Sequence, residues 1–391
     1  MLGTMIERHA TCSRNGIRSA LVVGGGIAGL GLAWALARRG LQVELFEQGS
    51  LPNPLSSSYD EHRIIRHAYG QLHGYARMMP HAFRVWDLMW KDFGASHYED
   101  SGTIHLTRTE DGWFEASVAS LNELGIWHRQ LSPAALVDRF PMIEPQGIRL
   151  AMVVGGSGIL YPQRILVDLL KLLARLGVHL RAGSRVSAID PERATLVVNS
   201  EVKSADVVVV AAGAWIDRLL SQFRGIVMPS RQTLLYLAPP TDFSSAWASA
   251  PPLLMHNRNG TLYALPPRSG TRLKIGDHHY TRTGDIDMPR EPSDAEVEVL
   301  WNDVRVGFRS PERYALLERK ACFYTVMDDE RFNVRQVGAR GWGISACSGH
   351  GFKLAPLIAE GVAKAIVGEV EAGTVTAWAA GRGPATLGGS L

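Results

Sequence analysis

The stretch Ala20-Leu21-Val22-Val23-Gly24-Gly25-Gly26-Ile27-Ala28-Gly29 decides the fold of this chain. A short apolar run ends in a glycine-rich turn, and helix-forming residues follow from 30 to 39, where Gly40 ends the segment. Residues 42–47 then alternate around apolar side chains, as a strand does. The pattern predicts a parallel βαβ unit with a right-handed crossover.

The glycines of this turn predict a dinucleotide site. A backbone without Cβ atoms can approach a pyrophosphate closely, and the following helix offers unpaired N–H groups at its positive end. Glu47 lies 18 residues after Gly29, at the end of the second strand, where a carboxylate can accept hydrogen bonds from ribose hydroxyls. The alternative is a glycine turn used only for helix packing. We expect the cofactor loop to comprise Gly24, Gly26, Ile27, Ala28, Gly29 and Glu47, a set that fits FAD and NAD alike.

Composition excludes several classes of protein. The chain has 391 residues, a net charge of +3, 20% charged residues and 46% hydrophobic residues, which is ordinary for a globular protein and gives no reason to expect nucleic-acid binding. Its three cysteines, Cys12, Cys322 and Cys347, are too scattered for a disulfide framework or a zinc site. We therefore expect no metal and a reducing, cytoplasmic compartment.

The N-terminal residues give no sign of targeting. Residues 1–18 lack the apolar core of a secretory signal, and Met5 is an alternative start. No apolar stretch in the chain is long enough for a membrane span.

The rest of the chain predicts two interleaved domains of an α/β protein. The dinucleotide domain continues through a helical segment at 165–176, a buried strand at 205–212 and a helix after Pro356. Two other stretches contain more Trp, Pro and short alternating runs, such as 261–265 and 272–276, and predict an antiparallel sheet with covering helices. We assign 19–83, 158–226 and 320–382 to the first domain, 84–157 and 227–319 to the second, and 1–18 and 383–391 to flexible tails.

Two further motifs predict chemistry. The run Arg63-Ile64-Ile65-Arg66-His67-Ala68-Tyr69-Gly70 carries two arginines whose planar guanidinium groups suit a carboxylate or phosphate, although a solvated helical face would also explain them. Cys322 lies between the glycine turn and a second glycine cluster, Ser348-Gly349-His350-Gly351-Phe352-Lys353. A cysteine there is a candidate covalent anchor for a flavin, and a small buried hydrophobic residue is the alternative.

With these motifs, the chain resembles the monomeric sarcosine oxidase and N-methyltryptophan oxidase family, within the D-amino-acid-oxidase-like flavoproteins. The likeness covers nearly all of residues 20–370. It rests on the motifs above, on Leu273-Lys274-Ile275-Gly276, and on Cys322-x-Tyr324-Thr325 with Asp328-Asp329-Glu330 and Phe332 behind it. The resemblance implies a Rossmann-like FAD-binding domain with an inserted substrate domain built mainly of antiparallel sheet.

The resemblance also implies roles for single residues. Cys322 matches the cysteine that is thioether-linked to the flavin 8α-methyl group, and Arg66 and Lys353 match the cations that hold the substrate carboxylate. Lys274 matches the lysine that promotes reaction with O₂, and Arg63 its basic companion on the ring. The remaining matches are His278 beside the substrate amine, Tyr263 and Tyr324 as pocket walls, and Gly349, His350, Gly351, Phe352 and Lys353 along the cofactor.

Some of these matches have structural alternatives, and two positions depart from the family pattern. His279 follows His278, so the register can shift by one, and the two tyrosines lie in runs where aromatic residues often only pack. His62 stands where the family tends to carry a small hydroxyl residue. Asp277 stands where an aromatic residue is usual. We expect its carboxylate to raise the pKa of His278, and we expect a substrate other than sarcosine or N-methyltryptophan.

The sequence thus predicts an FAD-dependent oxidase of a secondary or N-methylated α-amino acid, cyclic ones included, that yields an imine and H₂O₂. Its expected partners are a small amino acid and O₂, and we expect a monomer. The alternatives are a flavin-dependent dehydrogenase, an NADPH-using monooxygenase and a non-catalytic flavoprotein.

Overall fold

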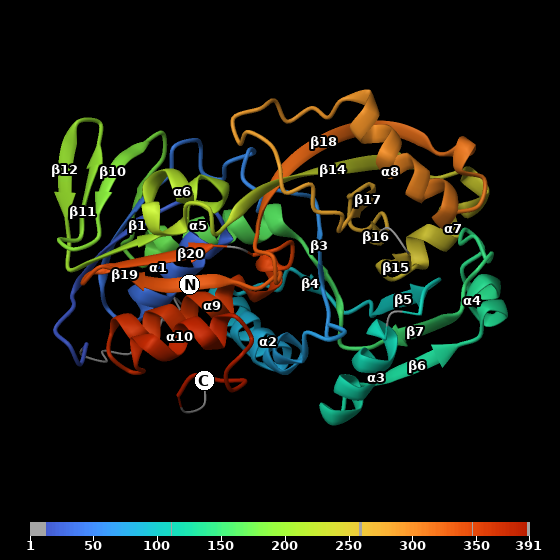
Figure 1. The fold of residues 1–391 in the computed structure, drawn as a ribbon, viewed down its shortest axis with the longest axis horizontal. Helices are drawn as coiled ribbons and strands as arrows, with labels where there is room; N and C mark the ends of the chain where they lie inside the picture. Colours follow the sequence, from blue (N-terminus) through green and yellow to red (C-terminus); the bar gives the residue numbers. More distant parts are fainter. Residues whose placement is uncertain (1–12, 111, 258–259, 346, 389–391) are drawn as a thin grey trace, which may run out of the picture.

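The computed structural model describes residues 13–110, 112–257, 260–345 and 347–388. Met5 and Cys12 lie outside the described residues. The chain folds into two lobes, each built on one large sheet, and crosses between them several times (Figure 1). Among the described residues, no helix is both long enough and apolar enough to cross a membrane.

The first lobe is built on a six-stranded sheet that contains the predicted βαβ unit. Its strands are parallel except for the edge strand β19, which pairs antiparallel with β20. In spatial order the strands are β19 (Asn333–Val337), β20 (Gly341–Ser345), β13 (Val207–Val210), β1 (Ser19–Val23), β2 (Gln42–Phe46) and β9 (His179–Arg181).

Helices cover one face of this sheet and a small sheet covers the other. Helix α1 packs against both α9 and α5, and the long helix α2 packs against α9. These helices are α1 (Ile27–Arg38), α2 (His73–Phe93), α5 (Pro162–Arg175), α9 (Gly351–Ile366) and α10 (Ala372–Ala379). On the opposite face, apolar side chains pack against the strands β10 (Val186–Asp190) and β11 (Thr195–Val198) and against the short helix α6 (Ile216–Leu219), and β12 (Glu201–Ser204) pairs antiparallel with β11.

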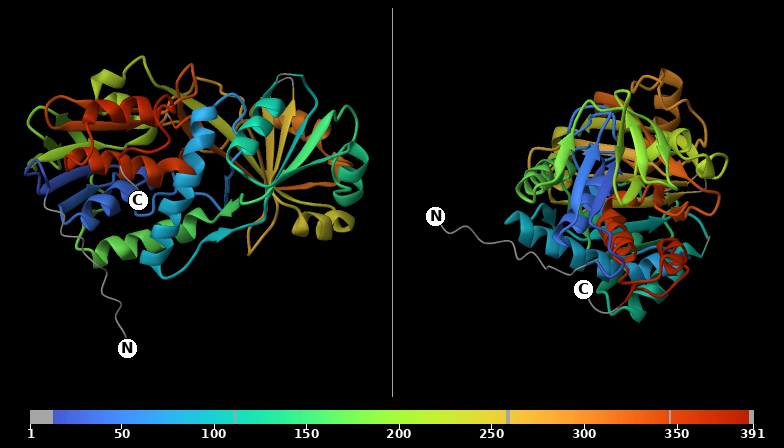
Figure 2. Two further views of the ribbon diagram at one scale, coloured as in Figure 1. Left: turned by 90° about the horizontal axis from the view of Figure 1, so that it is seen from below. Right: turned by 90° about the vertical axis from the view of Figure 1, so that its left-hand side faces the viewer.

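The second lobe is an eight-stranded, mainly antiparallel sheet, in which only the pair β15–β5 is parallel. In Figure 2 it forms a twisted fan at one end of the molecule. Its order is β18 (Ala315–Val326), β14 (Met228–Ala238), β17 (Leu273–Asp277), β16 (Gly260–Leu265), β15 (Leu253–Asn257), β5 (Thr103–Thr107), β7 (Leu150–Val154) and β6 (His128–Leu131).

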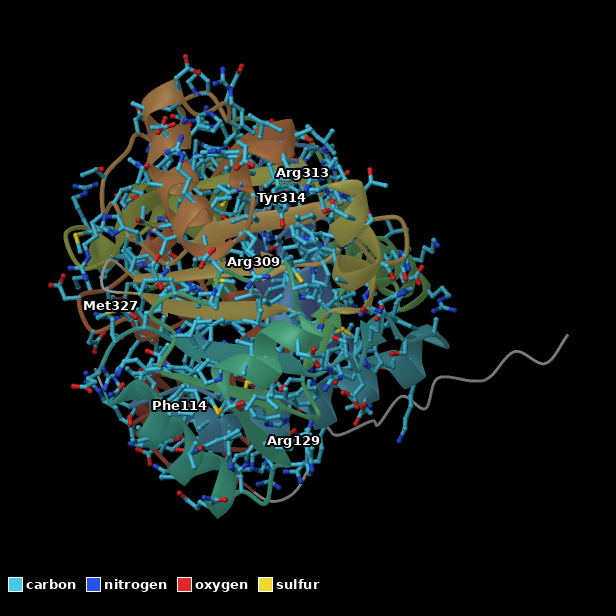
Figure 3. The ribbon with its side chains drawn as sticks, turned by 90° about the vertical axis from the view of Figure 1, so that its right-hand side faces the viewer. Phe114, Arg129, Arg309, Arg313, Tyr314 and Met327 are labelled. Atoms are coloured by element: carbon cyan, nitrogen blue, oxygen red, sulfur yellow. The ribbon has the colours of Figure 1, made fainter. Side chains whose placement is uncertain are left out.

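Helices α4 (Pro133–Arg139), α7 (Thr241–Ser249) and α8 (Asp294–Gly307) bury the outer face of this sheet. Figure 3 looks onto this end, with Arg313 and Tyr314 on the side of α7 and α8, and Phe114 and Arg129 on the side of α3 (Trp113–Glu123). A three-stranded sheet of β3 (Arg63–Ile65), β8 (Gly158–Leu160) and β4 (Tyr98–Glu99) joins the lobes. Short 3₁₀ turns complete the elements at Gly213–Trp215, Ser221–Phe223 and Pro311–Arg313.

Strand alternation decides which side chains face the first lobe. Successive side chains of a strand point to opposite faces, so Leu273 and Ile275 of β17 pack into the core of the second lobe, while Lys274 between them faces the other way. In the same way, Tyr263 of β16 and Tyr324 of β18 lie in a separate cluster on the inner face. This inner face is one wall of the site.

The fold class is confirmed, and single elements differ in their bounds. The helix predicted after Pro356 is α9, which begins at Gly351, five residues before that proline, and contains it. The predicted domain boundaries at 83/84 and 319/320 fall inside α2 and β18, so the division into domains stays a proposal. Parts of the expected flexible tails hold contacts: Arg14 N–H donates to Val367 O at 3.0 Å, and Trp378 Nε1 donates to Ala385 O at 3.3 Å.

Candidate functional site

A cavity of about 210 Å³ lies between the two lobes. At one end it meets the glycine turn after β1, and at the other it meets the inner face of β16, β17 and β18. The sequence-predicted residues on its wall are Gly24, Gly26, Ile27, Ala28, Glu47, Arg63, Arg66, Tyr263, Lys274, His278, Tyr324, Gly349, Gly351, Phe352 and Lys353. Gly29, Cys322 and His350 are the predicted site residues that the wall does not include.

The glycine turn has no room for side chains. Gly24 has a φ of +113°, and a Cβ there would lie 2.4 Å from Ala211 O. A Cβ on Gly29 would lie 1.9 Å from Gly24 O, which explains why Gly29 shapes the turn without lining the cavity. The helix α1 therefore starts directly at the cavity, where its unpaired N–H groups and positive end suit a pyrophosphate.

Serines that the sequence reasoning missed stand beside this turn. Ile27 N–H donates to Ser58 Oγ at 3.0 Å, and Ser56, Ser57 and Ser58 all line the cavity. Their only sequence signal is the run of three hydroxyl residues before Arg63. Hydroxyl groups at a helix N-terminus add donors to an anion site.

Glu47 holds the loops around the nucleotide end of the cavity together by hydrogen bonds. Its carboxylate accepts hydrogen bonds from Gly25 N–H at 2.7 Å, Gly49 N–H at 2.9 Å and Asn53 Nδ2 at 2.9 Å. A carboxylate has about four lone-pair positions, so one remains for a ligand hydroxyl. Asn53, which the sequence analysis did not single out, also lines the cavity.

At the other end, Lys274 of β17 and His278, the residue directly after β17, lie on one face because residues four apart in an extended segment point the same way. Gly276 lies between them and leaves space for Tyr263, since a Cβ at Gly276 would lie 2.4 Å from the Tyr263 hydroxyl oxygen. Tyr263 stands directly opposite Gly276 in the β16–β17 register. The glycine thus leaves the space that the tyrosine ring occupies at the wall.

A buried carboxylate, which the sequence analysis missed, holds two of the predicted cations. Lys274 Nζ donates to Asp60 Oδ2 at 2.7 Å, and Arg63 also forms an ion pair with Asp60. Burial lowers the pKa of Lys274 to about 8, Arg63 lowers it too, and Asp60 opposes both. Burial also works against the charge of Arg63, but Asp60 and the neighbouring groups Tyr324, Cys322 and Tyr263 together outweigh it and raise the pKa of this guanidinium.

The other two predicted cations are not neutralised. Among the described residues, neither Arg66 nor Lys353 forms an ion pair with a carboxylate. Lys353 is 6% exposed, and both cations lie near the Tyr69 ring, at 4.7 Å for the Arg66 guanidinium carbon and 5.9 Å for Lys353 Nζ. Burial lowers the pKa of both groups, and Arg66 lowers that of Lys353 further. Two uncompensated cations at a cavity wall favour an anionic ligand.

His278 is close to the cations and is neutral. Burial lowers its pKa to about 3, and Arg66 and Lys353 act in the same direction. Its ring reaches the second glycine cluster, since a Cβ on Gly349 would lie 3.2 Å from His278 Nδ1. A neutral ring there can exchange a hydrogen bond with a substrate amine.

The expected effect of Asp277 on His278 is wrong. Asp277 follows Gly276 in the strand, so its side chain points to the opposite face from His278 and does not line the cavity. Burial, together with Asp303, raises the pKa of Asp277 to about 6, with the His279 N–H opposing that rise. Asp277 therefore adds no negative charge beside the amine position.

The two described cysteines lie at different depths. Cys322 is 5% exposed and packs on the inner face of the second sheet with Tyr263 and Tyr324. Burial raises the pKa of its thiol, and Arg63 opposes that rise. Cys347 lines the cavity itself, close to Gly351.

The remaining predicted residues lie on the cavity wall or directly behind it. His350 lies behind the cavity wall, where its Nε2 hydrogen-bonds with Glu330 O at 3.2 Å, and burial lowers its pKa well below the ordinary value. Phe352 and Gly351 open helix α9 on the wall. Among the described residues, no group of three or more His, Cys, Asp or Glu side chains is placed to hold a metal ion.

A long dinucleotide fits this arrangement of residues. The glycine cradle and the N-terminus of α1 suit a pyrophosphate, Glu47 and Asn53 suit a ribose, and the far end offers cations and aromatic walls suited to a redox-active ring. The far end of the cavity lies against the inner face of the second lobe's sheet. The fold and the site together define a dinucleotide-binding protein whose cavity extends to a second, cationic end.

Comparison with known proteins gives the family. The family described as DAO, FAD dependent oxidoreductase, matches residues 19–365, and the chain belongs to it. It is therefore an FAD-dependent oxidoreductase, and the resemblance expected from the sequence is confirmed.

Individual relatives are similar over most of their length. Human peroxisomal sarcosine oxidase is 30% identical over 364 residues, covering 87% of this chain and 89% of that protein. N-methyl-L-tryptophan oxidase of Yersinia pestis is 25% identical over 347 residues, covering 87% and 92%. The open form of NikD, an unusual amino acid oxidase essential for nikkomycin biosynthesis, superposes with a TM-score of 0.78 at 18% identity, covering 91% and 95% of the two chains.

Proposed function

We propose that the chain is an FAD-dependent oxidase of a secondary or N-methylated α-amino acid, cyclic ones included. The observation that carries the proposal is the pair Arg66 and Lys353, two cations on the cavity wall that have no carboxylate partner among the described residues. A substrate carboxylate supplies the missing negative charge. The sarcosine and N-methyltryptophan oxidases among the relatives support an N-methylated amine beside that carboxylate.

The residues around the amine position favour its reactive form. An amine can give up a hydride equivalent only when its nitrogen carries a free lone pair, and the cations Arg66 and Lys353 disfavour a protonated amine nearby. The neutral ring of His278 adds no positive charge of its own and can accept a hydrogen bond from the amine N–H. The clamp thus orients the substrate and keeps the amine neutral.

In the proposed reaction the substrate loses two electrons and two protons across its C–N bond and leaves as an imine, which water hydrolyses. Bound FAD supplies the two-electron chemistry, and O₂ takes up the two electrons and two protons to become H₂O₂. Lys274 places an ammonium group at the ring end of the cavity, where positive charge stabilises the anion that forms as O₂ is reduced. Tyr263 and Tyr324 exclude water from the same end.

We also propose that the FAD is covalently attached through Cys322. Its strand carries Phe323 and Tyr324 on the cavity wall, and its thiol lies near Arg63 and Lys274. Cys347 is the alternative, because it lines the cavity directly. Acid precipitation separates the two: yellow colour should stay with the wild-type protein and with Cys347→Ala, and should be lost from Cys322→Ala. A flavin-labelled peptide that contains Cys347 would show that Cys347, and not Cys322, is the attachment site.

A peroxide assay tests the function. The purified protein should absorb near 450 nm and should form H₂O₂ with at least one N-methylated or cyclic amino acid in the absence of any nicotinamide. The panel should include primary amino acids and the matching amines without a carboxylate, which should react poorly. A colourless folded protein contradicts the proposal, and peroxide formation only with NADPH contradicts it in favour of the monooxygenase.

A further inference from the structure

Asp60 is the meeting point of three side chains from three elements. Its carboxylate accepts hydrogen bonds from Lys274 Nζ at 2.7 Å and from the Tyr236 hydroxyl at 2.7 Å, and it pairs with Arg63. Asp60 is 2% exposed and Lys274 1% exposed. A buried carboxylate with three donors has a fixed position, because moving it would leave charged groups without partners.

The strand register builds this arrangement. Tyr236 of β14 stands directly opposite Lys274 of β17, so both side chains leave the sheet at the same place on its inner face. Arg63 begins β3, which belongs to the small sheet between the lobes. Asp60 therefore ties the second lobe to the segment that carries Arg63 and Arg66.

Asp60 also divides the cations of the cavity into two kinds. Lys274 and Arg63 share its single negative charge, whereas Arg66 and Lys353 have no carboxylate among the described residues. The first pair lies at the ring end and the second at the proposed substrate clamp. One carboxylate thus distinguishes the two ends of the site.

We propose that Asp60 is a positioning residue for the reaction with O₂, which fixes the ammonium group of Lys274 at the ring end and keeps it charged. The inference rests on the proposed function, because it takes from it the role of Lys274. Asp60 acts through Lys274 and touches neither substrate nor O₂.

The groups that face Lys274 come from every neighbouring element. They are Asp60, His62 and Arg63 around β3, Tyr236 of β14, Tyr263 of β16 and Cys322 of β18. Burial, with Lys274 as the next cause, lowers the pKa of His62 to about 3, and burial raises the pKa values of Tyr236, Tyr263 and Cys322. These four groups are uncharged at neutral pH. Of the groups that face Lys274, Asp60 is therefore the one whose negative charge favours the ammonium form.

The pKa of Lys274 gives the direction of the pH shift expected when Asp60 loses its charge. The pKa of Lys274 is lowered to about 8 even with Asp60 present, so the ammonium form is lost as the pH rises through that value. Without the carboxylate, burial and Arg63 lose their main opposing interaction and the pKa of Lys274 falls further. The charge at the ring end would then be lost at a lower pH.

The test compares Asp60→Asn with the wild-type holoenzyme in two measurements across pH. The first is the rate at which the substrate-reduced enzyme reacts with O₂ in a stopped-flow instrument. The second is the affinity of the oxidised enzyme for sulfite, an anion that adds to the flavin ring and binds more tightly near positive charge. Both should show an inflection near pH 8 in the wild type, and both inflections should move down by at least about one pH unit in Asp60→Asn, which is about a tenfold change at the upper pH.

Three variants serve as controls. Glu61→Gln removes the charge of the neighbouring carboxylate, which accepts a hydrogen bond from Arg272 N–H at 2.8 Å and does not contact Lys274. Both inflections should therefore remain at the wild-type pH. Tyr236→Phe removes one donor from Asp60 and keeps every charge, so Asp60 holds its charge with one fewer hydrogen bond and the inflections should move by less than in Asp60→Asn. In a Lys274→Met background the inflections should be absent, and adding Asp60→Asn should not restore or shift them.

Unchanged inflections in folded, flavin-loaded Asp60→Asn overturn the proposal. If Asp60→Asn does not fold, an inflection near pH 8 that persists in Lys274→Met overturns it instead, because the charge would then belong to another group. Failure of the proposed function looks different: no amino acid reduces the flavin, while the sulfite titration still reports on Lys274 and Asp60.

Discussion

At the scale of single residues, Arg66 and Lys353 carry the charge that the cavity leaves uncompensated. We predict that Arg66→Ala and Lys353→Ala each raise KM for an amino-acid substrate by at least about 30-fold, since losing one partner of a buried charge pair costs about 2 kcal/mol or more. Arg66→Lys should recover part of the loss, because it keeps the charge but not the planar fork. Steady-state peroxide assays measure both.

Lys171→Ala is the matched control for Lys353→Ala, because Lys171 forms a surface ion pair with Asp168 at 2.9 Å. Its KM should be that of the wild type. Unchanged KM in both clamp variants, or equal losses with an amine that lacks a carboxylate, would rule out the clamp.

Asp277 gives a second prediction at this scale. Because its carboxylate points away from the cavity, Asp277→Asn should leave the pH dependence of anaerobic flavin reduction within about 0.3 pH unit of the wild type, well below the shift that a neighbouring charge produces. Stopped-flow absorbance at 450 nm measures it. A shift of a full unit would place Asp277 beside the amine after all.

Most of the charged residues on the wall were predictable from the sequence because short motifs carry them, such as the Arg63 to Gly70 run and the glycine cluster before Lys353. Asp60 was not, because its partners Lys274 and Tyr236 lie 214 and 176 residues away and no local pattern links them. The wrong expectation for Asp277 has a simple cause: neighbours in a strand face opposite ways, and only the paired sheet shows which face is inside.

At the scale of elements, the glycine turn before α1 gives a prediction with an internal control. Gly29→Ala places a Cβ 1.9 Å from Gly24 O and should abolish FAD binding, with a stability loss of about 1–3 kcal/mol from overpacking. Gly31→Ala in the same helix meets Ala359 Cβ at 3.6 Å and Pro356 Cα at 3.8 Å, both ordinary contacts. It should keep FAD and gain up to about 1 kcal/mol from better helix propensity.

The measurements are flavin absorbance of the purified protein and chemical denaturation of each variant. FAD retention in Gly29→Ala at wild-type stoichiometry would contradict the assigned cradle. Loss of FAD in both variants would show that the helix, and not the turn, is sensitive.

The sequence predicted the elements of the βαβ unit closely, since its strands and helix each carry a strong pattern. The start of α9 was misplaced because proline was taken to mark the beginning of a helix. In the fold, Trp86 Nε1 donates to Lys353 O at 2.9 Å, beside the carbonyl that Pro356 leaves without its helical donor. The Trp86 bond joins α2 to the first turn of α9, and the two helices must already be packed together for it to form.

At the scale of the whole molecule, the two lobes share the cavity and are crossed by the long paired strands β14 and β18. We predict that the holoenzyme unfolds in a single thermal transition, because FAD bound across both lobes couples them. Calorimetry with and without added FAD measures this, and the transition should rise with FAD concentration if the cofactor is not covalently held. Two well-separated transitions in the holoenzyme would contradict the shared site.

The fold class could be predicted from the sequence, but the residues at which the two domains divide could not. Repeated strand patterns indicated two sheets, and the resemblance supplied their arrangement. The boundaries at 84 and 320 fell inside α2 and β18 because both elements continue from one lobe toward the other, with no change of composition to mark the crossing.

The most direct test of the account is an anaerobic titration of the flavin-loaded protein with N-methylated and cyclic amino acids, followed at 450 nm. The account predicts that at least one of them bleaches the flavin, that the corresponding amine without a carboxylate does not, and that admitted O₂ restores the colour with one H₂O₂ formed per flavin. A flavin that no such amino acid bleaches, or that is bleached equally well by the amine without its carboxylate, would contradict it.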